Sequence, residues 1–141
     1  MSLQITNQAD YAMRALMYIA QAGPDRQVPS HEIAEKMVIS PMFLSRINSQ
    51  LSNAGLVNTR RGAHGGIMLS RPPSQINIYE ILTAIDGPIA MTNCSRNPGS
   101  CTLSKDCPLS SVWQEAEAQL IAHLKKTTLQ DLVDHKSVPT L

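Results

Sequence analysis

The chain has 141 residues, a formal net charge of +1, 43% apolar residues and only 4% aromatic residues. Such a length fits one domain, or one small domain with an extension, and so few aromatic side chains predict a modest core that dimerisation would enlarge. No apolar run reaches the roughly 18 to 20 residues that span a bilayer, and the opening stretch MSLQITNQADYAM has no signal-peptide pattern. We therefore expect a cytoplasmic protein with no membrane partner.

Positive charge is concentrated in one block of the chain. Between Glu35 and Glu80 there is no acidic residue, and this block has a charge of +5. A basic patch confined to one block is typical of a small DNA-binding surface. The alternative is a solvated face that happens to lack acids. The basic residues of the block are Lys36, Arg46, Arg60, Arg61 and Arg71.

The first two predicted elements are helices. Apolar residues at helical spacing predict a helix over 10–21, which Gly23 and Pro24 end. A short helix over 31–37 follows, with Ser30 as its expected N-cap.

A third helix begins after Ser40, with Pro41 at the first helical position, and extends to about Asn53. Two short helices joined by three residues, the second with a marked N-cap, predict a helix-turn-helix. The residues of the third helix expected to face the core are Phe43, Leu44, Ile47 and Leu51.

A β-hairpin is predicted after the third helix. Residues 56–59 form a short strand, 60–66 a glycine-rich turn and 67–69 a returning strand. Such a hairpin is the wing of a winged helix, and its basic side chains can reach a minor groove or phosphates. These side chains are Arg60, Arg61 and His64.

Two further helices are predicted beyond the wing. Asn77 caps a helix over 78–85, and a long helix over 108–126 measures about 28 Å. One apolar stripe on the long helix favours a dimer seam, although packing on its own domain is the alternative. The stripe consists of Leu109, Val112, Trp113, Ala116, Leu120 and Leu124.

Three cysteines, Cys94, Cys101 and Cys107, fall within fourteen residues, and the chain has no others. An odd number of closely spaced thiols is a poor disulfide framework, so these residues indicate soft ligands for a metal or an iron–sulfur cluster. A zinc site and a metal-free thiol switch are the alternatives. Because no phosphate cradle, nucleophile elbow or HExxH motif occurs, we expect no enzyme.

Four stretches together carry a specific combination of motifs: TNQADYAMRALMYIA, SPMFLSRINSQLSNAGLV, TRRGAHGGIMLSRPPSQINIYEIL, and the cysteines with DCPL before the long helix. With them the chain resembles the winged-helix regulators that include IscR, NsrR and RirA. The implied fold is mainly α with a small β-wing, a winged helix-turn-helix DNA-binding domain plus a long C-terminal dimerisation helix. The expected regions are 1–87 for DNA binding, 88–107 for the cluster-binding loop, and 108–141 for the dimerisation helix and tail.

Members of this family are dimers that bind inverted-repeat promoter sites, so the resemblance implies a homodimer on double-stranded DNA. It also implies that the helix from Pro41 enters the major groove and that the wing enters the adjacent minor groove. The implied DNA contacts are Ser40, Met42, Ser45 and Arg46 on the helix, with Arg60, Arg61 and His64 on the wing.

The resemblance further implies an iron–sulfur cluster on Cys94, Cys101 and Cys107, with 4Fe-4S favoured over 2Fe-2S. In IscR-like members a histidine three residues after the last cysteine is the fourth ligand, but Ser110 stands there. NsrR-like members use a carboxylate near the start of the first helix of the partner subunit, which here is Asp10. Asp10 could equally be only the N-cap of its helix.

On this resemblance we expect a repressor whose operator binding depends on the cluster. The pattern is closest to NsrR-like or RirA-like members. Nitric oxide, oxygen, iron availability and redox status all remain open as the signal.

Overall fold

The computed structural model describes residues 3–103 and 105–134. The C-terminal tail beyond Asp134, which the sequence assigned to the last region, lies outside these residues. In chain order the elements are α1 Asn7–Ala22, α2 Ser30–Met37, α3 Pro41–Asn53, β1 Val57–Arg60, β2 Gly66–Leu69, the 3-10 turn η1 Pro73–Gln75, α4 Ile78–Asp86, α5 Asn93–Arg96, α6 Pro108–Lys126 and α7 Leu129–Asp134.

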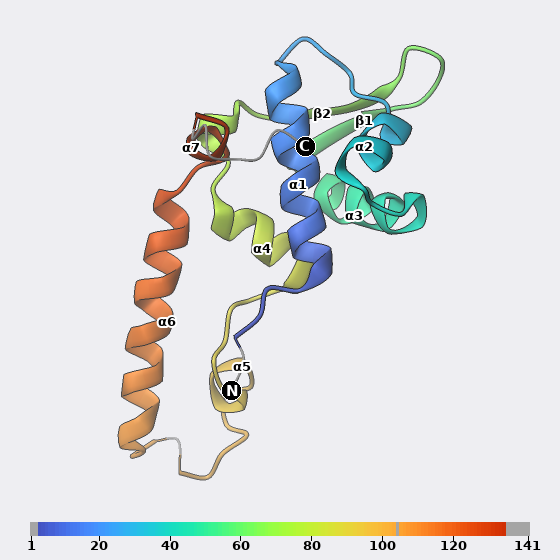
Figure 1. Cartoon of the computed structure of the whole chain (residues 1–141). Coiled ribbons are helices and arrows are strands. Elements are labelled where there is room, and N and C mark those ends of the chain that lie inside the picture. Colours follow the sequence, from blue (N-terminus) through green and yellow to red (C-terminus); the bar gives the residue numbers. More distant parts are fainter. Residues whose placement is uncertain (1–2, 104, 135–141) are drawn as a thin grey trace.

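Helix α1 is the centre of the DNA-binding unit. It lies between α2, α3 and the hairpin on one side and α4 and α7 on the other (Figure 1). Its small and aliphatic residues form a fully buried stripe, because apolar residues three and four apart share one helix face. The buried residues of α1 are Ala9, Ala12, Ala15, Leu16 and Ile19.

The prediction that α1 begins at Asp10 was wrong by three residues, because the helix begins at Asn7 and its N-cap is Thr6. The Thr6 hydroxyl accepts a hydrogen bond from the Ala9 N–H at 3.1 Å. Threonine is a favoured N-cap because its oxygen satisfies an otherwise unpaired amide of the first turn. Asp10 therefore lies inside the helix and does not cap it.

The helix-turn-helix is confirmed, with differences at the caps. Ser30 is the first residue of α2 and not its cap, which is Pro29. Ser40 occupies the N-cap position of α3 ahead of Pro41, but its side chain makes no capping hydrogen bond. In the turn between the two helices Val38 adopts a left-handed conformation, with φ of 55°.

One of the four expected core residues of α3 was assigned to the wrong face. Leu44, Ile47 and Leu51 are buried, whereas Phe43 is 45% exposed. Phe43 precedes Leu44 by about 100° around the helix and so lies outside the buried stripe. Its ring instead lies against Tyr11 of α1, with the ring centroids 6.4 Å apart.

The wing is an antiparallel hairpin of β1 and β2, in which Val57 pairs with Leu69 and Arg60 with Gly66. An isolated β-bridge joins Val28 to β2 of the hairpin. The Val28 N–H donates to the Ile67 carbonyl at 3.0 Å, and the Val28 carbonyl accepts from the Ile67 N–H at 2.8 Å. The bridge brings the backbones so close that a Cβ at Gly66 would lie 2.7 Å from the Val28 carbonyl.

Helix α4 confirms the predicted Asn77 cap as a complete capping box. The Asn77 side chain accepts from the Glu80 N–H at 2.9 Å, and the Glu80 carboxylate accepts from the Asn77 N–H at 3.1 Å. Glu80 also pairs with Arg71 at 2.9 Å, which fixes the end of the wing to α4.

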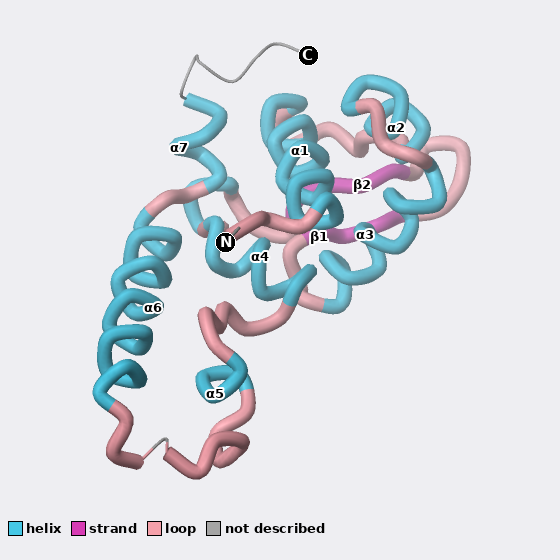
Figure 2. The backbone as a smooth tube through the Cα atoms, turned by 60° about the horizontal axis from the view of Figure 1, so that its bottom comes forward, coloured by secondary structure: helices cyan, strands magenta, loops and turns pink. Residues whose placement is uncertain are grey.

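Helix α6 projects from this unit, with the short helix α5 beside it (Figures 1 and 2). None of the described residues of α6 is buried. Its C-terminal end returns to the DNA-binding unit, where the Ile78 N–H donates to the Thr127 carbonyl at 3.0 Å and the Leu129 N–H to the Ile76 carbonyl at 2.8 Å. Leu129 of α7 is fully buried, so α7 packs as part of the core.

No helix in the described part of the chain is long and apolar enough to cross a membrane.

Candidate functional site

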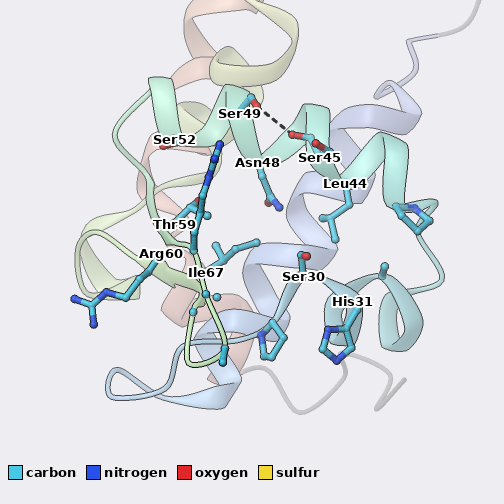
Figure 3. Close-up of a pocket in the computed structure, with 18 of the residues that line it drawn as sticks. Ser30, His31, Leu44, Ser45, Asn48, Ser49, Ser52, Thr59, Arg60 and Ile67 are labelled. Carbon is cyan, nitrogen blue, oxygen red and sulfur yellow. Dashed lines mark hydrogen bonds between the residues drawn. The ribbon is translucent and has the colours of Figure 1, made fainter.

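An open groove of about 1060 Å³ separates α3 from the wing and the start of α2. Figure 3 shows side chains of α3 facing Thr59 and Ile67 of the hairpin, with Ser30 and His31 of α2 closing one end. The polar part of the lining consists of hydroxyl and amide groups, one histidine and two arginines, donors that suit an anionic backbone. The polar residues that line it are Ser30, His31, Ser45, Asn48, Ser49, Ser52, Asn53, Thr59, Arg60 and Arg61.

Four small polar residues of α3 form one wall of this groove. Ser45, Asn48, Ser49 and Ser52 recur at the spacing that places residues on one helix face. Ser49 donates to the Ser45 carbonyl at 3.2 Å, whereas the Asn48 amide oxygen is buried with no hydrogen-bond partner in the described structure. The sequence analysis predicted Ser45 but missed Asn48, Ser49 and Ser52. Their spacing on one helix face, beside the buried stripe, could have indicated them.

The predicted DNA-contact residues are all exposed. Ser45, Arg60 and Arg61 line the groove. Met42, which is 79% exposed near the start of α3, lies outside the groove lining. The other predicted contacts outside the lining are Ser40, Arg46 and His64.

Not all of the basic block is free to attract an anion. Arg71 is held by Glu80 and by the Gln75 carbonyl, each at 2.9 Å, and so has a structural role. Within the described residues the ion pairs join Asp10 to Arg14, Arg26 to Glu32 and Arg71 to Glu80. Four residues of the basic block take part in none of these pairs: Lys36, Arg46, Arg60 and Arg61.

The Arg26–Glu32 pair lies at the start of α2. Its guanidinium donates to the Glu32 carboxylate at 2.7 Å, and this hydrogen bond lowers the pKa of Glu32 below its ordinary value. Glu32 therefore keeps its negative charge beside Arg26, and the two charges balance each other in the first turn of α2.

The three cysteines occupy different parts of the segment between α4 and α6. Cys94 lies on α5, Cys101 is exposed in the following loop, and Cys107 is the N-cap residue of α6. The Thr92 hydroxyl caps α5 by accepting from the Ser95 N–H at 3.2 Å, and it lies 3.1 Å from the Cys94 sulfur.

Over residues 3–103 and 105–134, no three His, Cys, Asp or Glu side chains are close enough to share a metal ion. In this conformation of the single chain, the three cysteine thiols are therefore not close enough together to bind one metal ion. Their chemistry still fits a cluster, because each cysteine is at least partly exposed and all three belong to one segment with few and short elements.

Ser110 and Asp10 occupy the two positions at which related regulators would have the fourth ligand of the cluster. Ser110, in the first turn of α6, accepts a hydrogen bond from the Gln114 amide at 3.1 Å. Asp10 has a side chain that is 50% exposed and is paired with Arg14 at 2.6 Å along α1.

A winged helix-turn-helix with a polar groove between α3 and the wing defines a DNA-binding transcriptional regulator. The chain belongs to the Rrf2 family, described as an iron-dependent transcriptional regulator, which matches residues 5–135. The expected family resemblance and winged-helix fold are therefore confirmed, and the chain is a regulator and not an enzyme.

Known proteins support the same assignment. The chain is 35% identical to the HTH-type transcriptional regulator NsrR of Bacillus subtilis, over 95% of this chain and 92% of the relative. It is 31% identical to NsrR of Shouchella clausii, over 93% and 89% of the two chains. Its fold is similar to that of CymR, the global cysteine regulator of B. subtilis, with a TM-score of 0.76 and 26% identity over 94% and 97% of the chains.

Proposed function

We propose that the chain is a homodimeric repressor whose binding to inverted-repeat operator DNA is controlled by an iron–sulfur cluster. The observation that carries this proposal is the position of the three cysteines. They lie between the DNA-binding unit and α6, the helix with the exposed apolar face. Since operators are read from inside the cell, the protein would act in the cytoplasm.

The groove supports a specific way of docking on DNA. With α3 in the major groove and the wing in the adjacent minor groove, one sugar–phosphate strand would pass through the groove between them. Ser49, Ser52 and Thr59 would donate to its phosphates, which positions the protein without reading sequence.

The exposed start of α3 would contact the bases in the major groove, and the wing would enter the minor groove. Arginine suits the wing because its charge and planar donors favour a narrow minor groove. The proposed base contacts are Ser40, Met42, Ser45 and Arg46, and the proposed wing contacts are Arg60, Arg61 and His64.

The α6 helix is the proposed dimer seam. Leu109, Val112 and Leu120 lie on one face and are 58%, 54% and 44% exposed. Trp113 and Leu124, which the sequence placed in the same stripe, are half-buried. Pairing the exposed face with a second copy would remove apolar surface from water and give the two-fold symmetry that an inverted repeat requires.

Cys94, Cys101 and Cys107 would hold the cluster, with Asp10 of the other protomer as fourth ligand. A 4Fe-4S cluster suits three thiolates and one oxygen ligand better than 2Fe-2S, which is the second choice. Such a cluster supplies iron that nitric oxide or oxygen can attack. Asp10 would have to leave Arg14 to act as a ligand, which its exposure allows.

A ligand on α1 would influence the recognition helix directly. Tyr11, the neighbour of Asp10, lies against Phe43 of α3 and under the Arg14 guanidinium, which is 5.5 Å from the ring centroid. Coordination of the other protomer's cluster by Asp10 would therefore fix the spacing of the two α3 helices. Loss of this coordination would weaken operator binding, because it would shift the population of dimer arrangements.

The second candidate is a regulator with a zinc site or a metal-free thiol switch. The similarity in fold to CymR, the global cysteine regulator of B. subtilis, favours this candidate. Oxidation of two thiols to a disulfide, by a peroxide that is reduced to water, would move the same loop.

An absorption spectrum of anaerobically purified protein, with iron and sulfide assays, distinguishes these functions. A visible band that bleaches with nitric oxide, together with loss of binding to a labelled operator, is the expected result. A colourless protein that holds zinc or no metal after anaerobic reconstitution would overturn the cluster. A Cys101→Ser variant is the matched control, since it should abolish the band and leave the fold unchanged.

A further inference from the structure

The beginning of the cysteine segment is attached to α6 by one side chain. The Met91 N–H donates to a carboxylate oxygen of Glu117 at 2.6 Å. Glu117 lies in the third turn of α6 and is half-buried, and it belongs to none of the ion pairs within the described residues. A charge-assisted hydrogen bond of this length is among the stronger polar contacts of a protein.

The end of the same segment is also attached to α6, because Cys107 is the N-cap residue of that helix. Glu117 is ten positions after Cys107, which corresponds to about 15 Å along the helix axis. Both ends of the segment 91–107 are therefore held by one rigid helix.

A short series of contacts continues from Glu117 to a thiol. Met91 is followed by Thr92, whose hydroxyl caps α5 and lies 3.1 Å from the Cys94 sulfur. Helices α5 and α6 are in contact, and Figure 1 shows α5 beside the N-terminal half of α6. Met91 and the α5 cap thus connect the Glu117 carboxylate to Cys94 along the chain.

We propose that Glu117 is a positioning residue of the cysteine segment, and that its carboxylate sets where Cys94 lies relative to Cys107. Because α6 is also the proposed dimer seam, the same contact would place the thiols relative to the second protomer. The consequence for a cluster rests on the proposed function, whereas the anchoring of the segment does not.

The chain offers a conservative variant and a matched control. Glu117→Gln keeps a side-chain oxygen that can accept from Met91, and Glu117→Ala removes it. Glu115→Ala removes the same charge two residues away, from an exposed side chain that accepts a hydrogen bond from the Gln119 amide at 3.5 Å. All three should keep the helix content of the parent chain.

The first measurement is amide hydrogen exchange at Met91 in protein freed of metal by chelation. We expect exchange about tenfold faster in Glu117→Ala, the loss expected when an amide loses its hydrogen-bond acceptor. Glu117→Gln should stay close to the parent and Glu115→Ala should equal it. Equal exchange in Glu117→Ala and Glu115→Ala would overturn the anchoring, whatever the cofactor.

The second measurement is the rate at which the visible band of reconstituted protein decays in air. We expect decay about tenfold faster in Glu117→Ala, the lower end of the range for residues that orient ligands, and recovery in Glu117→Gln. Decay at the rate of Glu115→Ala would overturn the positioning role. If the parent chain forms no band, the proposed function fails, and the exchange experiment alone decides the anchoring.

Discussion

Thr6 and Asp86 join the start of α1 to the end of α4. The Thr6 hydroxyl lies 2.8 and 2.9 Å from the two carboxylate oxygens of Asp86, across 80 residues of sequence. The same hydroxyl oxygen accepts from the Ala9 N–H as the cap of α1. One side chain thus caps the N-terminus of α1 and also contacts the last residue of α4, after which the chain leaves for the cysteine segment.

Thr6→Val should therefore destabilise the fold by about 1–2 kcal/mol, the usual cost of a lost N-cap. Urea unfolding of the variant measures this free energy. Thr6→Ser keeps the hydroxyl and should stay within about 0.5 kcal/mol of the parent. A valine variant as stable as the serine variant would show that the cap and the Asp86 contact contribute nothing.

Asp10→Ala tests the proposed fourth ligand. The Asp10–Arg14 pair is an exposed ion pair, so its loss should change the free energy of unfolding by less than about 1 kcal/mol. The visible spectrum of the reconstituted protein, or its response to nitric oxide, should change markedly.

Arg14→Gln is the matched control, because it removes the ion pair and leaves the Asp10 carboxylate in place. Its spectrum should equal that of the parent. If Asp10→Ala leaves both the visible spectrum and the response to nitric oxide unchanged, Asp10 is not a cluster ligand.

The glycine pair of the wing should not tolerate a side chain. A Cβ at Gly65 would overlap the Arg60 carbonyl, and one at Gly66 would press on the Val28 backbone. We expect Gly66→Ala to weaken operator binding and to destabilise the fold by about 1–3 kcal/mol. Ala63→Ser in the exposed turn is the control and should change neither. Calorimetry and a DNA-binding titration measure the two effects, and a fully active Gly66→Ala protein would contradict the close approach.

Arg60→Ala and Arg61→Ala should each weaken DNA binding to all sequences and reduce the slope of log affinity against log salt by about 1. Arg46→Ala should instead relax the preference at one base position, with a cost of about 1–3 kcal/mol on the best operator. Titrations at several salt concentrations, on operator and on unrelated DNA, separate these effects. Unchanged salt slopes in both wing variants would exclude a phosphate contact there.

A charge on the exposed face of α6 should separate the proposed dimer. Val112→Asp places a carboxylate where we expect a second copy, and burying an unpaired charge is costly. The variant should sediment as a monomer in analytical ultracentrifugation and lose operator binding. Gln114→Asp, on an exposed part of the same helix outside the apolar face, should stay dimeric. A dimeric Val112→Asp protein would contradict the seam.

The features that the sequence predicted correctly depend on interactions between residues a few positions apart. Asn77 with Glu80 three residues later is a capping box whose effect depends only on neighbouring backbone amides. Pro41 at the first position of α3 and the glycine pair of the wing are similarly short-range signals. The cysteine spacing is visible in the chain itself.

The two errors have different causes. Thr6 was missed although its capping contact with the Ala9 N–H is local, because Asp10, four residues later, is also a favoured N-cap residue type. Phe43 carries an apolar side chain, yet its direction follows from Tyr11 and from the buried stripe of α3.

By itself the sequence determined α1 to α4, α6, the turn and the wing, since each depends on periodicity, caps and turn residues within a few positions, and its motifs indicated the family by resemblance. Helix α5 lies in a segment that the sequence predicted as a loop. Only the tertiary structure decided the groove between α3 and the wing, the return of Leu129 into the core, and the attachment of Met91 to Glu117. These features join residues far apart in the chain. Their partners are chosen by packing and hydrogen-bond satisfaction in three dimensions, which no local pattern encodes.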